Sequence, residues 1–225
     1  MPTLELRSLH YLLIVLALAA ALAADVHTDI VGQTALSAAI WLLLFSLLTR
    51  VRRDQRYLLM ACLTIATIGE LVLSLVWGLY AYRLGNIPLF VPPGHVLLLM
   101  LGLALARRIS DKGAYVVTGC AGIYAAIATT TGLDTFAAPL FLIIAVAWLI
   151  LPAHRRLYAG TFVVSLGLEL YGTWLGNWSW AAQVPGMSLV TTNPPGTVGA
   201  FYCALDALVL ATMLVIAPRV RAGTV

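Results

Sequence analysis

Apolar residues along this chain are gathered into long runs that short polar breaks separate. The runs are about 15 to 20 residues long, and helices of that length match a hydrocarbon core roughly 30 Å thick. The pattern therefore predicts eight helices, at about residues 9–24, 33–49, 57–77, 95–108, 113–130, 135–152, 157–174 and 197–218. The predicted fold class is all-α and polytopic, with one transmembrane domain over residues 1–225.

The composition agrees with this pattern, because 62% of the residues are hydrophobic and only 10% are charged. Such a balance is far from that of a soluble domain. The net charge of +4 does not indicate nucleic acid as a partner, because the basic residues are few and scattered over the helix ends. The expected surroundings are the lipid bilayer, and we expect an integral protein of a bacterial cell membrane.

The basic residues also predict an orientation. With eight spans, one side of the membrane receives nearly all of them: Arg7, Arg50, Arg52, Arg53, Arg56, Arg107, Arg108, Lys112, Arg155, Arg156, Arg219 and Arg221. Only Arg83 falls on the other side. By the positive-inside rule both termini are cytoplasmic and the two longest loops face outward.

The two halves of the chain share a pattern with a period of about 100 residues, as expected of an internal duplication. In each half a glutamate is followed about ten residues later by an aromatic-x-aromatic pair and then by Pro-Pro-Gly. The first copy contains Glu70, Tyr80, Tyr82 and Pro92-Pro93-Gly94, and the second contains Glu169, Trp178, Trp180 and Pro194-Pro195-Gly196. We therefore predict two parallel four-helix repeats, about 9–108 and about 113–218, with one pocket between them.

The duplication is imperfect. Asp206 lies about eleven residues after Pro195, where the first copy has Ala104, and His95 follows the first Pro-Pro-Gly where the second copy has Thr197. These differences are candidates for the residues that make the site.

Carboxylates provide the main candidate chemistry, since Glu70, Glu169 and Asp206 are the acidic residues inside predicted spans. A central Asp costs roughly 2.5–3.5 kcal/mol to insert, so such side chains normally face a protein interior or a wet cavity. With no Lys or Arg at their depth, we expect at least one of them to be protonated and able to donate a proton. The alternative is that each carboxyl only joins helices through hydrogen bonds.

Aromatic and polar residues near the predicted outer loops are candidates for binding a substrate. They are Trp77, Tyr80, Tyr82, Trp174, Trp178, Trp180, Tyr202, Asn193 and His95. Aromatic rings here either form an ordinary interfacial belt or line the pocket, where their faces would stabilise a cation. Tyr202 lies one turn before Asp206, and His95 is a candidate proton relay.

The sequence lacks the motifs of several classes of enzyme. The chain has no P-loop, no GxSxG, no HExxH and no Asp-rich pair for a magnesium-bound diphosphate. Its cysteines, Cys62, Cys120 and Cys203, fall singly in apolar runs. We therefore expect no metal and no cofactor.

In its duplicated carboxylates and aromatic-rich loops, the chain resembles the small integral-membrane isoprenoid cyclases. These include fused heterodimer-type lycopene cyclases and the membrane-bound terpene cyclases of terpenoid-hybrid pathways. There is a weaker likeness to carotenoid hydratases, which also place a glutamate ahead of Tyr-x-Tyr, as in Glu70, Tyr80 and Tyr82. The resemblance to terpene cyclases implies a pair of one glutamate and one late aspartate, which here would be Glu70 or Glu169 with Asp206.

What the resemblance implies is metal-independent cyclisation of a linear isoprenoid, an isomerase-type or lyase-type reaction started by a protonated carboxyl. Asp206 is then the expected donor, because it breaks the repeat, and Glu169 and Glu70 are the expected partner or base. Two other functions remain open: a proton-coupled transporter of small molecules, and a non-catalytic membrane assembly factor. The sequence leaves the substrate's chain length, the product and the oligomeric state open.

Overall fold

The computed structural model describes residue 4 and residues 6–222, with side chains up to residue 215. Helices make up 72% of it. The eight α-helices are α1 (Ser8–Asp25), α2 (Ile30–Leu48), α3 (Arg53–Glu70), α4 (Val91–Ala106), α5 (Asp111–Thr130), α6 (Ala137–Ile150), α7 (Arg155–Leu175) and α8 (Gly199–Ala222). The prediction of a mostly helical chain is confirmed. Arg219 and Arg221, used above for the orientation, lie beyond the described side chains.

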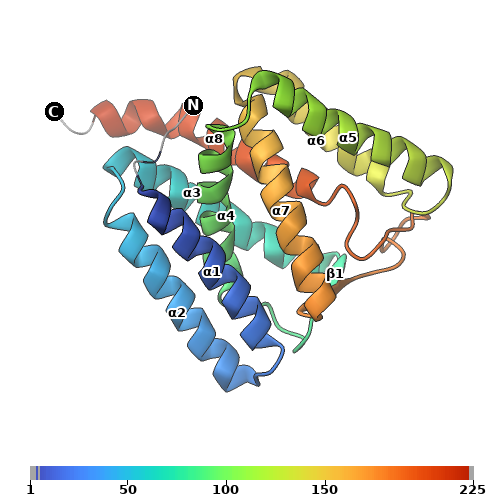
Figure 1. The fold of residues 1–225 in the computed structure, drawn as a ribbon, viewed down its shortest axis with the longest axis horizontal. Helices are drawn as coiled ribbons and strands as arrows, with labels where there is room; N and C mark the ends of the chain where they lie inside the picture. Colours follow the sequence, from blue (N-terminus) through green and yellow to red (C-terminus); the bar gives the residue numbers. More distant parts are fainter. Residues whose placement is uncertain (1–3, 5, 223–225) are drawn as a thin grey trace.

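Helices α4 and α7 pack against each other at the centre (Figure 1). The pair α1–α2 lies at one edge and the pair α5–α6 at the opposite edge, while α3 and α8 pack on each other and on the central pair (Figure 1). Small residues permit the central contact. A Cβ on Gly160 would lie 2.9 Å from the carbonyl oxygen of Gly102, and a Cβ on Gly102 would lie 2.3 Å from the Thr161 hydroxyl. Close backbone approach at small residues is typical of helix pairs in membranes.

The outer surface of the bundle is apolar. Leu9, Val31, Leu42 and Leu149 are each more than two-thirds exposed. A soluble protein would not leave so many large apolar side chains in water. Hydrocarbon is the solvent that suits this surface.

By length and composition, four described helices can cross a membrane: α1, α2, α5 and the continuous helix Arg53–Val76. A fifth is added if α6 and α7, which are bent by 110° at a short break, count as one span. Helix α4 has only 16 residues, and at about 1.5 Å per residue it is shorter than a hydrocarbon core of about 30 Å. The structure therefore supports a membrane protein with four or five candidate spans, and it does not establish the predicted eight.

Four short elements were not predicted. Helix α3 continues as a π-helical segment, η1 (Leu71–Val76), and a 3-10 turn, η2 (Pro152–His154), precedes α7. Two three-residue strands, β1 (Tyr80–Tyr82) and β2 (Trp178–Trp180), pair antiparallel. We call these two strands the ribbon. It joins the loop after η1 to the loop after α7, segments that are far apart in the sequence.

Candidate functional site

A cavity of about 350 Å³ lies at the ribbon end of the bundle. Its walls come from α1, α3, η1, α4, α7 and α8, and both strands of the ribbon close it. Most of the lining is aliphatic, including Leu18, Leu22 and Leu98, whereas the polar groups are concentrated around Glu70 and Glu169. An apolar cavity with a few convergent polar groups is the usual form of a small-molecule site.

Glu70 is the last residue of α3 and is 6% exposed. Its Oε2 accepts hydrogen bonds from the hydroxyls of Tyr80, at 2.9 Å, and Tyr82, at 2.7 Å. Both tyrosines lie on β1, where alternate side chains point to the same face. Burial raises the pKa of both phenols, and the adjacent Glu70 raises it further. The two hydroxyls therefore stay protonated and act as donors.

The other oxygen of Glu70 faces His95 on α4, with Oε1 3.4 Å from Nε2. The second ring nitrogen, Nδ1, lies 3.1 Å from the carbonyl oxygen of Val91. A carbonyl oxygen can only accept, so a hydrogen on Nδ1 suits this contact. Nε2 is then the ring nitrogen that faces the carboxyl group of Glu70. Glu70 and His95 are thus close enough to form an ion pair or to exchange a proton.

Glu169 on α7 is 5% exposed and lies among three hydrogen-bonding side chains. Its Oε1 accepts from the Tyr202 hydroxyl at 2.8 Å, and its Oε2 accepts from the indole nitrogens of Trp178, at 2.8 Å, and Trp180, at 3.2 Å. An indole N–H can only donate. In these three contacts Glu169 acts as an acceptor, so none of them requires a proton on its carboxyl group.

The ribbon positions the aromatic rings of both centres. Its register pairs Tyr80 with Trp180 and Tyr82 with Trp178, and these four side chains are buried while Ala81 and Ser179 between them are exposed. The ring of Trp178 lies over Gly172 of α7, where a Cβ would come within 2.0 Å of the ring. That glycine is therefore required for the ring to reach Glu169.

The two carboxylate centres are also in contact through rings. His95 stacks on Tyr202 with ring centroids 5.2 Å apart and an angle of 10° between the planes, and Tyr80 lies 4.7 Å from Trp180. The rings of both centres line the same cavity, together with Phe201. One molecule in the cavity would therefore touch both centres.

Asp206 lies elsewhere. It is 1% exposed on α8, does not line the cavity, and its Oδ2 accepts a hydrogen bond of 2.6 Å from the Thr161 hydroxyl of α7. Thr161 also faces Gly102 at the central helix contact. The described contact of Asp206 thus joins α8 to α7.

Three of the aromatic and polar candidates do not reach the cavity. Trp174 is 79% exposed, and the indole of Trp77 donates to the carbonyl of Pro185 at 3.0 Å. Asn193 accepts from the backbone N–H of Trp180 at 3.0 Å and so holds β2 in place. The structure brings Glu70, Glu169, Tyr80, Tyr82, Trp178, Trp180, Tyr202 and His95 together at the cavity.

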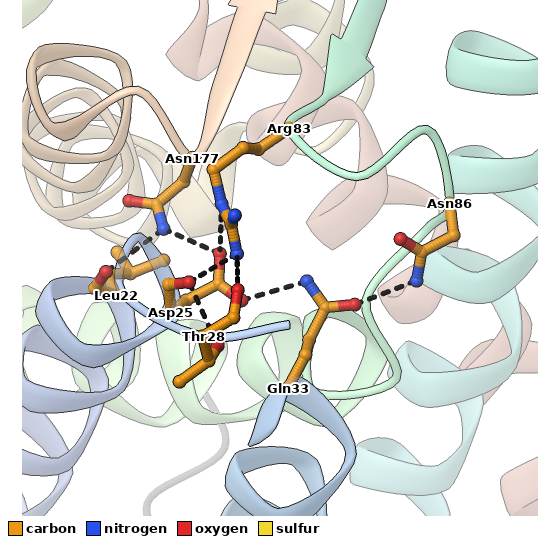
Figure 2. A network of polar contacts seen from close by, with 7 residues as sticks. All are labelled: Leu22, Asp25, Thr28, Gln33, Arg83, Asn86 and Asn177. Carbon is orange, nitrogen blue, oxygen red and sulfur yellow. Dashed lines mark hydrogen bonds and ion pairs between the residues drawn. The ribbon is translucent and has the colours of Figure 1, made fainter. Parts of the chain in front are cut away.

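Sequence reasoning missed a buried polar network beside the ribbon, which Figure 2 shows. Asp25, at the end of α1, is 1% exposed and accepts from Gln33 at 2.8 Å and from Asn177 at 3.0 Å. The Arg83 guanidinium lies 3.8 Å from the same carboxylate and also donates to the backbone carbonyls of Asp25 and Thr28. The network ties the start of α2 and the loops beside both strands to the end of α1.

A second loop carboxylate, Asp134, is also fully buried. Its Oδ2 accepts from the backbone N–H of Gly196 at 3.1 Å and from the hydroxyls of Tyr124 and Thr192 at 3.3 and 3.2 Å. It thereby holds the Pro-Pro-Gly turn before α8. A lone aspartate in a short polar break gives no sequence signal that it will be buried.

Within the described residues, no group of three or more His, Cys, Asp or Glu side chains is arranged to hold a metal ion. Comparisons with protein-family models, with curated proteins and with solved structures find no match to this chain.

Proposed function

We propose that this chain is a membrane-bound isoprenoid cyclase that starts its reaction by protonating a linear, apolar substrate. The observation that supports this most directly is the contact between Glu70 and His95, which in the proposal share a proton, at the polar end of an otherwise apolar cavity. A proton donor in surroundings that exclude water can act on an alkene, because water does not compete for the proton or for the cation that forms.

In the proposed reaction, Glu70 transfers the proton to a terminal carbon of the substrate's alkene, or to the oxygen of an epoxide. A C–H or O–H bond forms, and a carbocation is left on the substrate. A second double bond attacks this cation and closes a ring. Loss of a proton from the cyclised cation then gives a neutral product, so that alkene cyclisation is an isomerisation overall.

The rest of the cavity suits the cationic stage. In the proposal Glu169 is the ionised carboxylate that balances the carbocation and accepts the final proton. The faces of the surrounding rings contribute about 0.5–2 kcal/mol each to a cation at close range. These groups are already oriented by hydrogen bonds before the substrate binds, as in a preorganised electrostatic site. A proton passing back from Glu169 to Glu70 and His95 would restore the starting state.

The proposal gives Asp206 a different role from the one expected from the sequence. Because it does not line the cavity, we assign the donor role to Glu70 and assign Asp206 to the joint between α7 and α8. Asp206→Asn is then expected to lower the melting temperature, while the protein that remains folded keeps most of its turnover.

The test of the proposed function is product analysis in a host that makes linear farnesyl and carotenoid precursors. We expect a cyclic product with the mass of its linear precursor, and for an alkene substrate in D₂O one carbon-bound deuterium per product molecule. The double variant Glu70→Gln/Glu169→Gln is the control, and we expect it to give no new product. If the purified chain converts no linear isoprenoid in lipid vesicles, the proposal fails.

We also propose the finer architecture, eight membrane crossings in two parallel units. The ribbon supports it, because its register is symmetric about the pair Ala81–Ser179, as a two-fold axis between equivalent strands requires. The basic ends of α3, α4 and α7 lie away from the ribbon along each helix, which supports cytoplasmic basic loops and an outward ribbon. Cysteine-labelling of intact cells at Ser179 and Ser110 tests it: only Ser179→Cys is expected to react from outside.

A carrier of small organic cations is the second candidate. It is favoured by the breaks in regular helix, namely the change from α to π directly after Glu70 and the bend between α6 and α7. Carriers use discontinuous helices at their binding sites. Uptake of a labelled cation into vesicles, with no product of altered structure, would favour the carrier over the cyclase.

A further inference from the structure

The cavity does not lie wholly inside the bundle. Three of its lining side chains are large, apolar and about half exposed: Ile68 at 55%, Val72 at 45% and Leu208 at 56%. Ile68 and Val72 lie on the continuous helix Arg53–Val76, and Leu208 lies on α8, which packs against α3. The cavity wall therefore reaches the outer surface of the protein between α3 and α8.

That surface is apolar around the opening. On η1, Leu71, Leu75 and Val76 are 46%, 60% and 80% exposed, and they belong to a helix long and apolar enough to cross a membrane. An opening bounded by such side chains faces hydrocarbon in a bilayer and not water.

The ribbon end is closed by contrast. The four rings of the ribbon are buried over the cavity, and the network around Asp25 ties the adjoining loops to α1 and α2 (Figure 2). A substrate arriving from water at this end would have to break buried hydrogen bonds and an ion pair. Removing one partner from such a network is costly.

Glycine leaves room at the side opening. A Cβ built on Gly69, which lines the cavity, meets no atom within 4 Å. The position is helical, where glycine is less stable than alanine by about 1 kcal/mol, and Gly69 directly precedes Glu70. A side chain added here would therefore begin in open space at the cavity wall.

We propose that the ligand of this cavity is a linear isoprenoid chain dissolved in the bilayer, which enters sideways between α3 and α8. Its reacting end reaches Glu70, His95 and Glu169, while the remainder of a long chain stays in the lipid. The inference rests on the proposed function for the identity of the chain. A volume of about 350 Å³ is at the small end of the usual range of about 300–1,000 Å³, so a long chain fits only if the cavity is open to lipid.

The test is photolabelling in lipid vesicles with a linear isoprenoid alcohol that carries a diazirine beside the hydroxyl, in the part of the chain that the proposal places at the opening. Labelled peptides are mapped by mass spectrometry, without any need for turnover. We expect labels on residues 65–72 and 204–208, and we expect Gly69→Trp to remove them. Gly167→Trp is the matched control: Gly167 is two residues before Glu169, also meets no atom within 4 Å and does not line the cavity.

Leu208→Trp fills the opening from the α8 side and serves as the second variant if Gly69→Trp does not fold. Label that persists at these peptides in both folded variants would overturn the side opening, as would wild-type label confined to peptides other than these two. Loss of label in the wild-type protein on adding unlabelled isoprenoid alcohol is expected. If the label maps to the opening but no cyclic product forms, the lateral binding site stands and the cyclase proposal fails. If both plugged variants cyclise isoprenoids at the normal rate, the cyclase proposal stands and the lateral entry fails.

Discussion

The two carboxylate centres of this molecule have the same construction but different contacts. Each consists of a glutamate near the end of a helix and an aromatic-x-aromatic strand that donates two hydrogen bonds to one carboxylate oxygen. The remaining oxygen differs: in the first centre it meets the imidazole of His95, and in the second it meets the hydroxyl of Tyr202. The first centre therefore places an imidazole against its glutamate, whereas the second surrounds its glutamate with hydroxyl and indole donors.

The difference also shows what the aromatic pairs do. Tyrosine hydroxyls in the first centre can donate or accept, so they tolerate both protonation states of Glu70. The indoles in the second centre can only donate, and they support Glu169 as an acceptor. In the proposed reaction the two carboxylates would serve different steps, which is how pairs of carboxylates divide acid and base roles in other sites.

The largest expected effect is that of Glu70→Gln. The amide keeps the size of the side chain but has no acidic proton, and loss of a general acid reduces rates by about 10²–10⁴-fold. Initial rates with purified protein in vesicles measure it, with the melting temperature as the check on folding. Turnover at the wild-type rate would show that Glu70 is not the donor.

His95→Thr is expected to have the next largest effect, because it gives the first centre the residue found at the matching place in the second copy. Without the imidazole, Glu70 loses the group with which it shares its proton, and we expect a loss of about 10²-fold and a changed pH profile of the rate. His95→Gln, which retains a polar side chain, is the comparison. If both variants keep the wild-type profile, the shared proton has no part in the reaction.

Glu169→Gln should weaken the site for cations more than for neutral molecules. Loss of one stabilising group from an electrostatic site costs on the order of 10²-fold in rate. Competition by a tertiary-amine analogue of the substrate measures the affinity for a cation, and the neutral isoprenoid alcohol is the reference. Equal losses for amine and alcohol would contradict the assigned role.

Tyr80→Phe and Tyr82→Phe are expected to have the smallest effects. Each removes one of two similar hydrogen bonds to Glu70 Oε2, worth about 1 kcal/mol and so about fivefold in rate. The double variant leaves that oxygen without either donor and should lose more than the sum of the single changes. Additive losses measured in the same rate assay would indicate that the two hydroxyls act separately.

The sequence predicted the helices well because long apolar runs carry a strong and repeated signal. Each of the eight α-helices begins within a few residues of its expected position, as with α5, expected at 113–130 and found at Asp111–Thr130. The number of membrane crossings is a harder inference, because α4 and α6 are short and α7 is bent sharply against α6. Run length alone cannot show whether such helices cross or only pack inside the bundle.

Sequence reasoning found the carboxylates and aromatic pairs of the candidate site through their repetition. Glu70 and Glu169 stood out because the same aromatic pattern follows both, and the structure places each beside its own pair. The pairing of the strands was not predicted, because three residues give too short a period to recognise. The burial of Asp25 was missed for a related reason: its partners, Arg83 and Asn177, come from distant loops.

The symmetric register of the ribbon has a consequence for the origin of such a chain. A protein carrying only one of the two units could close the same ribbon by pairing with a second molecule of itself about a two-fold axis. Both subunits of that homodimer would then hold identical carboxylates, and any histidine gained by one would be gained by the other. In the proposed two-unit architecture, covalent joining of the units removes this constraint and allows His95 to lie on one side of the cavity alone.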